Sequence, residues 1–452
     1  MKKLAAISLL LLFFLPTAAQ KTNSTALSRT IDEIVKKELT QPAAGISIAV
    51  ARDGKLIFSK GYGMANLEHS VPVAPETVFH IDSISKNILA AVVLKLVEQG
   101  KLSLDDDIRK YVPDAPVNGK LVTIRQLLSH TSGIYSFTSL PNASDNERLD
   151  FSHKQVLALV KDKPFDFEPG TRWRYDNTGF FLAGMAVESV TKQDYAAYLR
   201  ENVFKPLGMN ATSLCDARMI VPHLASGYET EKDSLVNAEF LSWKLPWAAG
   251  AVCATAEDLV KWQSALENGA FISRQSLELM RAPTRLSDGT MVDYGLGTRR
   301  GSLDGHTFFG HTGSGGGFRN VIEAFPADHL IIAVLINADR PPPLEIAADI
   351  VRAVLGLPKK ALLGLPVPEN ELQALSKKWD SDDGPVEIFA ADGKLHYRIL
   401  GTPVTGVLRR QAENIYAIND RVEVRFLVRN GQAMYSFVYN NGIFADAKYV
   451  IP

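Results

Sequence analysis

The spacing of apolar and polar residues predicts strands toward both ends of the first 356 residues and helices between them. In "GISIAVARDGKLIFSKGYG" (45–63), apolar and polar residues alternate on both sides of Asp53-Gly54, which predicts a β-hairpin. A short strand is expected over 307–314, and the continuous, mainly apolar run 329–338 is typical of a strand buried on both faces. Helices are predicted over about 83–99, 258–269 and 343–356.

This order of elements predicts an α/β (α+β) fold in which one sheet is formed from both chain ends and flanked by helices, with an inserted helical domain. After residue 357 the sequence pattern changes. Residues 358–368 are rich in proline and are predicted to be a linker. Within 369–452, short strand patterns around Asp392-Gly393 and Asn430-Gly431 predict a small antiparallel β-domain, either a barrel or a sandwich.

Residues 1–19 have the pattern of a signal peptide. Two lysines precede the apolar run 4–15, and Thr17-Ala18-Ala19 resembles a cleavage site before Gln20. The run is shorter than the ~20 residues that span a bilayer, which favours a cleaved leader over an uncleaved anchor. We therefore expect a protein exported to the bacterial periplasm or the medium, with its main domain over 20–357 and no membrane contact beyond the leader.

Composition narrows the possible partners and cofactors. The 452 residues are 46% apolar with a formal net charge of −1, so a large core is expected and nucleic acid is not expected as a partner. Cys215 and Cys253 belong to no CxxC or Cys/His cluster, and the nine histidines are scattered, so no metal site is expected. The cysteines could pair in an oxidising compartment, but two separate buried thiols is the preferred interpretation.

The stretch "HIDSISKNI" (80–88) carries the first candidate chemistry. Ser83 and Lys86 are three residues apart, so on a helix their side chains share a face and can meet. A serine becomes a good nucleophile when a base takes its proton, and a lysine can be that base when burial lowers its pKa. A surface serine beside a solvated lysine would give the same motif. The second copy, Ser189-Val-Thr-Lys192, fits that interpretation. Only the first copy leads into a strongly apolar helix.

Two further stretches add groups that a serine hydrolase needs. Tyr175 and Asn177 stand just before a predicted helix, and "FFGHTGSGGGF" (308–318) ends a strand in a glycine-rich loop. A tyrosine can share a proton with Lys86, an amide can hold a substrate carbonyl, and a backbone N–H can complete an oxyanion hole. Each stretch also has a local interpretation, as a packed tyrosine, a turn asparagine or a flexible loop.

As an ordered set, these motifs resemble those of the class C-like serine hydrolases within the serine β-lactamase and penicillin-binding protein superfamily. The three motifs are Ser83-Ile-Ser-Lys86, Tyr175-Asp-Asn177 and His311-Thr-Gly313. Further matching stretches are 100–108, 123–133, 206–213 and 294–297. The resemblance covers roughly residues 28–356 and implies a β-lactamase-like fold with an antiparallel sheet and no metal or organic cofactor. The tail is similar to the small β-domain often appended to these hydrolases.

The resemblance also implies a role for each matching residue. Ser83 would be the acylated nucleophile, with Lys86 and Tyr175 as base and proton relay. The backbone N–H groups of Ser83 and Ser314 would form the oxyanion hole. His130 lies in a loop signature that is interpreted as structural. The residues implied in substrate binding are Asn177, His311 and Gly313.

Three positions depart from the family pattern. His311 replaces a lysine, and a histidine is mostly neutral above its usual pKa of about 6.5, which weakens any attraction for a substrate carboxylate. Asp82 precedes the nucleophile where a small residue is more usual; it is predicted to cap the helix, although its i,i+4 spacing to Lys86 also permits an ion pair. Asp176 replaces a small residue within Y-x-N, with no role predicted.

The motif set predicts a secreted serine hydrolase that cleaves an ester, amide or peptide through an acyl-Ser83 intermediate. An esterase or a D-amino-acid peptidase-like enzyme is expected over a true β-lactamase. The alternative is a penicillin-binding or sensing module that keeps the fold but deacylates slowly or not at all, an interpretation that rests on Asp82 beside the nucleophile.

Overall fold

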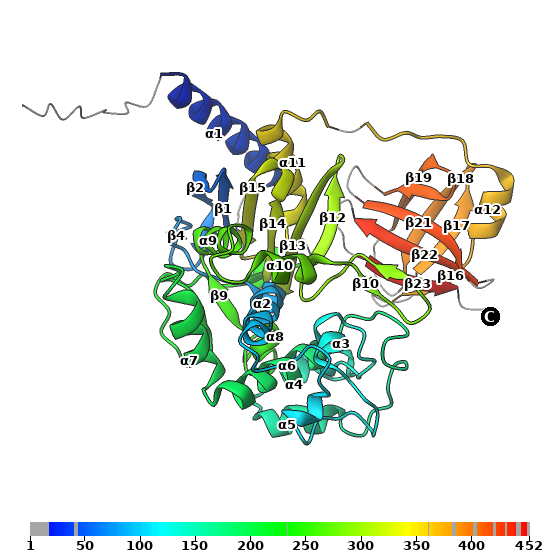
Figure 1. Ribbon diagram of the computed structural model, residues 1–452. Coiled ribbons are helices and arrows are strands. Elements are labelled where there is room, and N and C mark those ends of the chain that lie inside the picture. The colour runs from blue at the N-terminus through cyan, green and yellow to red at the C-terminus, as the bar shows by residue number, and fades with distance from the viewer. Residues whose placement is uncertain are drawn as a thin grey trace, which may run out of the picture.

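The computed structural model of the chain describes a larger body of sheet and helices and a smaller β-barrel, joined by an extended segment (Figure 1). The described residues are 18–39, 44–232, 234–359, 361–381, 386–400, 405–418, 422–429, 432–439 and 444–449. Most of the predicted leader (1–17) and the turn predicted at Asn430-Gly431 lie outside them. No helix in the described part of the chain combines the length and apolar character that crossing a bilayer requires.

A six-stranded antiparallel sheet forms the centre of the larger body. Its strand order is β12-β13-β14-β15-β1-β2, so strands from both chain ends pair, as predicted; Ile46 of β1 lies opposite Ile336 of β15. Neither β12 nor β14 was predicted. The bounds are β1 Ile46–Arg52, β2 Lys55–Tyr62, β12 Arg299–Leu303, β13 His306–Gly315, β14 Phe318–Phe325 and β15 Leu330–Ile336.

Both faces of the sheet are covered, which explains the uninterrupted apolar run of β15. Ile332 and Val334 pack into a cluster shared with helices α1 (Ala18–Glu38) and α11 (Pro343–Leu355). Ala333 and Leu335 point to the opposite face and join the cluster of the remaining helices, among them α9 (Ala256–Glu267). Because alternate residues of a strand face opposite sides, full coverage requires apolar residues at every position.

The helical region is inserted between β2 and β12 and carries a small three-stranded sheet, in the order β5-β9-β6. Its helices are α2 Ser85–Glu98, α3 Ile124–Leu128, α4 Ala143–Glu147, α5 His153–Val160, α6 Asn177–Thr191, α7 Tyr195–Leu199, α8 Trp247–Gly250 and α10 Arg274–Arg281. Its short strands are β3 Met64–Asn66, β4 Val71–Pro72, β5 Phe79–His80, β6 Ser213–Leu214, β7 Tyr228–Glu231, β8 Ser234–Asn237, β9 Val252–Ala254, β10 Thr284–Arg285 and β11 Met291–Val292.

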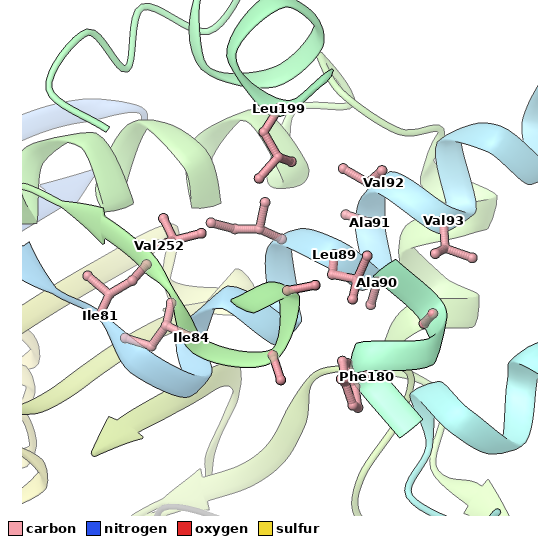
Figure 2. Close-up of a cluster of buried hydrophobic side chains, with 14 of the residues drawn as sticks. Ile81, Ile84, Leu89, Ala90, Ala91, Val92, Val93, Phe180, Leu199 and Val252 are labelled. Carbon is pink, nitrogen blue, oxygen red and sulfur yellow. The ribbon is translucent and has the colours of Figure 1, made fainter. Parts of the chain in front are cut away.

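Helix α2 runs through the middle of this body and is buried along most of its length. Ile81, Ile84 and Val252 pack at its start, and Phe180 of α6 lies in the same cluster (Figure 2). The first turn, Asp82–Ile84, is a 3-10 helix, so the α-helix begins two residues later than predicted, at Ser85. This apolar packing fixes the position of the serine in that turn.

The C-terminal region forms a closed eight-stranded antiparallel barrel in the described part of the chain. The predicted hairpin at Asp392-Gly393 is present between β17 and β18. Helix α12 (Glu369–Leu375) precedes the barrel and was not predicted. The strands are β16 Lys378–Ser381, β17 Val386–Ala391, β18 Lys394–Ile399, β19 Thr405–Ala412, β20 Ile415–Ala417, β21 Val422–Arg429, β22 Gln432–Tyr439 and β23 Phe444–Tyr449.

Candidate active site

Ser83 sits in a tight turn pressed against the end of strand β13. The preceding residue, Asp82, has a positive φ of 49°, a conformation that aspartate tolerates better than most residues with a side chain. Gly313 packs against the Ile81 carbonyl so closely that a methyl group there would overlap it, and a methyl group at Gly315 would contact the Asp82 carboxyl. The glycines of β13 therefore let the strand approach the turn Asp82–Ile84, which carries the candidate nucleophile Ser83 and is called the nucleophile turn below.

Lys86 is fully buried, with its amine directed at Ser83. Its Nζ lies 3.0 Å from Ser83 Oγ and donates a hydrogen bond to the Ala249 carbonyl oxygen at 2.7 Å. Burial lowers the pKa of Lys86 to about 7, although the nearby carboxylates of Asp82 and Asp176 oppose that shift. A large fraction of Lys86 is therefore neutral near pH 7 and can accept the Ser83 proton.

Tyr175 completes the set around the serine. Its Oη donates to Ser83 Oγ at 2.7 Å, and its ring centroid lies 4.9 Å from Lys86 Nζ. Burial raises the pKa of Tyr175 well above its usual value, so the phenol keeps its proton at neutral pH. In the free protein Lys86 is therefore the group able to act as base, and Tyr175 is a hydrogen-bond donor.

The second S-x-x-K copy has a different environment. Ser189 lies in α6, and Lys192 ends that helix with a positive φ of 57° and an exposed side chain. The amine of Lys192 is therefore solvated, whereas that of Lys86 is buried against Ser83. The difference between the copies is burial, as the apolar sequence after Ser83 indicated.

Asp82 does not cap helix α2, so that prediction is wrong. No side-chain cap is formed at either Ile81 or Ile84, the residues that precede the 3-10 turn and the α-helix. Instead, the buried Asp82 carboxyl accepts a hydrogen bond from Asn320 Nδ2 at 3.2 Å. Burial raises the pKa of Asp82, and the charges of Arg319 and Lys86 act against that shift.

Asp176 is the residue that caps a helix here. Its carboxylate accepts hydrogen bonds from the Gly179 N–H and from Ser132 Oγ, both at 3.0 Å, at the start of α6. Burial raises the pKa of Asp176 to about 7. The cap anchors the segment that carries Tyr175, and the Nδ2 of the following Asn177 is oriented by Thr138 Oγ1 at 2.9 Å.

His311 belongs to a buried chain of hydrogen bonds that the sequence did not reveal. Its Nε2 lies 3.0 Å from Tyr294 Oη, which in turn lies 3.1 Å from His130 Nε2. Burial lowers the pKa of His311 to about 3 and that of His130 well below its usual value, with the charge of Lys86 adding to both shifts. The H-T-G motif therefore supplies no cation at neutral pH.

Ser314 and Gly313 lie on β13 beside the nucleophile turn. Ser314 is exposed and pairs in register with Arg319 of β14, and Gly313 is buried against Ile81. The role of the Ser83 and Ser314 N–H groups as an oxyanion hole, like that of Asn177 in substrate binding, stays a prediction. The fold brings these positions to the same region as Ser83.

Cys215 and Cys253 form a disulfide, so the preferred interpretation of two separate thiols is wrong. Their Cα atoms are 5.9 Å apart, which lies within the range for disulfides. The pairing of β6 with β9 brings them together, because Ser213 lies opposite Cys253 in that sheet. The other neighbour of Cys253 is His80 of β5, three residues before the nucleophile.

Tyr294 is the residue of this site to which the sequence attached no role. It begins the stretch 294–297, which was identified only as a matching signature. The signal that points to it is the glycine at 297, which has a positive φ of 58° and packs against the Lys86 backbone. Glycines of this kind mark a close approach of two backbone segments.

The chain belongs to the beta-lactamase family, which matches residues 27–356. Protein flp of Staphylococcus aureus (strain N315) is 33% identical over 241 residues, which are 51% of this chain and 47% of flp. The chain thus spans about half the length of this curated relative. The resemblance inferred from the motifs is confirmed at the level of the family.

Two solved structures show how far the fold is shared. The octameric penicillin-binding protein homologue from Pyrococcus abyssi is 27% identical with a TM-score of 0.64, and the alignment covers 96% of this chain and all of that one. A D-stereospecific amidohydrolase from Streptomyces sp. is 26% identical with a TM-score of 0.61, over 73% of this chain and 98% of that one. The β-lactamase-like fold with an appended all-β domain is therefore confirmed.

Proposed function

We propose that the chain is a serine hydrolase that cleaves an ester or amide bond through an acyl-Ser83 intermediate. The observation that carries this proposal is the pair of contacts on Ser83 Oγ, with Lys86 Nζ at 3.0 Å and Tyr175 Oη at 2.7 Å. A nucleophile held by a neutral buried amine and a phenol has both a proton acceptor and a proton donor within reach.

In acylation, Lys86 accepts the Ser83 proton while Oγ bonds to the substrate carbonyl carbon. The carbonyl oxygen gains the negative charge and is held by the backbone N–H groups of Ser83 and Ser314. Collapse of this tetrahedral intermediate breaks the bond to the leaving group, which takes a proton delivered from Lys86 through Tyr175. In deacylation, water replaces the leaving group and the same steps run in reverse, which frees the acid and restores the Ser83 hydroxyl.

The substrate proposed is an ester or a D-amino-acid amide or peptide rather than a β-lactam. Both ring nitrogens of His311 are engaged, Nδ1 with the Thr312 carbonyl at 2.6 Å and Nε2 with Tyr294. A neutral imidazole with no free donor offers little attraction to the carboxylate of a β-lactam. The similarity to a D-stereospecific amidohydrolase supports the amide class.

Labelling of the nucleophile tests the proposal directly. A fluorophosphonate should modify the purified mature protein once, at Ser83, as located by peptide mass spectrometry. Ser83→Ala should remove the label and all turnover, whereas Ser189→Ala, in the exposed copy of the motif, should change neither. An unlabelled Ser83 in folded wild-type protein would refute the mechanism.

A substrate panel separates the candidate activities. Aryl esters, D-amino-acid amides and a chromogenic cephalosporin are compared with wild-type protein and Ser83→Ala. Turnover of esters or D-amides, with little or none of the cephalosporin, is expected.

The second candidate, a binding or sensing module, is favoured by the Asp82 carboxyl, which acts against the lowered pKa of Lys86. It would give a stoichiometric adduct that does not turn over.

We also propose that the protein is exported, on the basis of the leader-like pattern in residues 1–19. Expression of the full chain in a bacterial host, followed by N-terminal sequencing of the extracytoplasmic protein, should give a mature chain that begins at Gln20. A chain retained in the cytoplasm with Met1 intact would contradict this proposal.

A further inference from the structure

The hydroxyl of Tyr294 lies between two buried imidazoles. His130 Nε2 is 3.1 Å away on one side and His311 Nε2 is 3.0 Å away on the other. Tyr294 is 4% exposed, His311 2% and His130 0%, so the three side chains exchange no hydrogen bonds with bulk water. A buried phenol with a histidine on each side must donate to one and accept from the other.

The outer ends of this chain determine the direction of every hydrogen bond in it. The Asp176 N–H donates to His130 Nδ1 at 2.9 Å, so a neutral His130 carries its proton on Nε2. The Thr312 carbonyl can only accept, so His311 carries its proton on Nδ1, 2.6 Å away. His130 Nε2–H therefore donates to Tyr294 Oη, and the Tyr294 O–H donates to His311 Nε2.

This chain connects the two motifs that face each other across Ser83. At one end it begins at the backbone of Asp176, next to Tyr175, whose ring centroid is 4.3 Å from that of His130. At the other end it reaches Thr312, two residues before Ser314 on β13. The proton relay and the oxyanion strand are thus tied together by hydrogen bonds that do not involve the substrate.

We propose that Tyr294 is a positioning residue of the hydrolase: its hydroxyl bridges the neutral rings of His130 and His311, whose tautomers the Asp176 N–H and the Thr312 carbonyl fix, and thereby keeps Tyr175 and strand β13 in register around Ser83. The inference rests on the proposed function and adds a residue to it. Without the hydroxyl, His130 Nε2–H loses its acceptor and His311 Nε2 loses its donor, so the link between the two rings is broken.

The charged and titratable groups that surround the chain favour its uncharged state. Lys86 of α2 faces both imidazoles, and Arg299 of β12 faces His311 and Tyr294. Tyr175 faces Tyr294, and among the described residues Asp82 and Asp176 bring carboxyl groups to this side of the site, with Glu323 beside Arg299. A proton on either histidine would place a second positive charge near Lys86 whenever that amine is protonated. This repulsion favours neutral imidazoles.

The test compares Tyr294→Phe with Tyr195→Phe. Tyr195 is a similarly buried tyrosine in α7 whose hydroxyl has no hydrogen-bond partner among the described residues, so the same chemical change there removes no hydrogen bond that the structure describes. For Tyr294→Phe we expect kcat on the best ester to fall on the order of 10- to 100-fold with KM little changed. We also expect the acid limb of the rate profile to move to higher pH, because His311 Nε2 loses its donor and binds a proton more readily. Kinetics of Tyr294→Phe that match those of Tyr195→Phe would overturn the proposal.

A measurement without turnover keeps the inference separate from the proposed function. Nitrogen-15 NMR of histidine-labelled wild-type protein, with signals assigned through His311→Gln and His130→Gln, reports the tautomer of each ring. We expect His130 as the Nε2–H form and His311 as the Nδ1–H form, both uncharged down to pH 5. A charged His311 at pH 6, or its Nε2–H tautomer, would overturn the inference even if Ser83 is acylated. If Tyr294→Phe does not fold, this wild-type spectrum still tests the direction of the hydrogen bonds on which the inference rests.

Discussion

Lys86 Nζ lies 2.7 Å from the Ala249 carbonyl oxygen, although 163 positions separate the two residues in the sequence. This hydrogen bond orients the buried amine and leaves its other hydrogens, or its lone pair when it is neutral, for Ser83 Oγ, 3.0 Å away. A carbonyl accepts from an amine and, more strongly, from an ammonium, so the contact can hold Lys86 in place in both of its protonation states.

Replacing Lys86 by methionine should abolish most of the activity and leave the fold intact. Without a base, the Ser83 hydroxyl keeps its proton, and kcat/KM should fall about 10²–10⁴-fold. Methionine fills a similar volume without a buried charge, so thermal stability should be equal or higher. Lys192→Met, in the exposed copy of the motif, is the matched control and should retain wild-type activity. Comparable activity of the two variants would exclude Lys86 as the base.

The pH dependence should follow the same lysine. Because burial lowers the pKa of Lys86 to about 7, kcat/KM should rise with pH through about 7 as the amine loses its proton. Between pH 7 and 10.5 the unfolded chain binds a proton that the folded chain has released, so the free energy of unfolding should rise with pH across that window. Urea titrations at several pH values measure this slope, which Lys86→Met should remove. A slope unaffected by the substitution would mean that Lys86 is charged in the folded protein.

Asp82→Asn should move the acid limb of the rate profile to lower pH. The Asp82 carboxylate raises the pKa of Lys86, so its removal should free the amine of its proton at lower pH. Asparagine also tolerates the positive φ at this position and can keep the contact with Asn320. Rate profiles of both proteins on one ester give the comparison. Superimposable profiles would show that Asp82 is itself protonated when the enzyme works.

Gly313→Ala should damage both folding and activity. The added methyl group would overlap the Ile81 carbonyl, so β13 must move away from the nucleophile turn, at a cost of about 1–3 kcal/mol. Gly364→Ala is the control, since a methyl group there meets no atom of the described part of the chain within 4 Å. Thermal denaturation and ester turnover of both variants are compared. A wild-type melting temperature for Gly313→Ala would disprove the close packing.

Reduction of the Cys215–Cys253 disulfide should destabilise the protein. The bond closes a loop with a sequence separation of 38, for which chain entropy suggests roughly 3–4 kcal/mol. Denaturant unfolding with and without a reductant measures the loss, and a double Cys→Ser variant should be equally unstable and insensitive to the reductant. Identical unfolding midpoints for wild-type protein in both conditions would mean that the two sulfurs are not bonded.

Local pattern was sufficient for much of the fold. The hairpin of β1 and β2, the doubly buried β15 and the pairing of both chain ends follow from runs of residues that are close in sequence. Strands β12 and β14 were missed because "RRGSL" and "FRNVIEAF" lack a regular alternation, and their extended conformation depends on pairing with β13. Asp82 was misassigned as a cap because the preference of aspartate for helix starts is a local rule, whereas here Asn320 of β14 binds the carboxyl.

The sequence by itself determined which chemistry this protein can hold: the one-turn spacing of Ser83 and Lys86, the Tyr175 motif and the glycines of β13 are all readable from the chain. Only the tertiary structure decided the state of those groups. The depressed pKa of Lys86, the tautomers of His130 and His311, and the pairing of Cys215 with Cys253 depend on atoms that the fold brings together from distant segments. The protonation state of a group depends on the atoms that surround it in space, and a local pattern of residues does not specify those atoms.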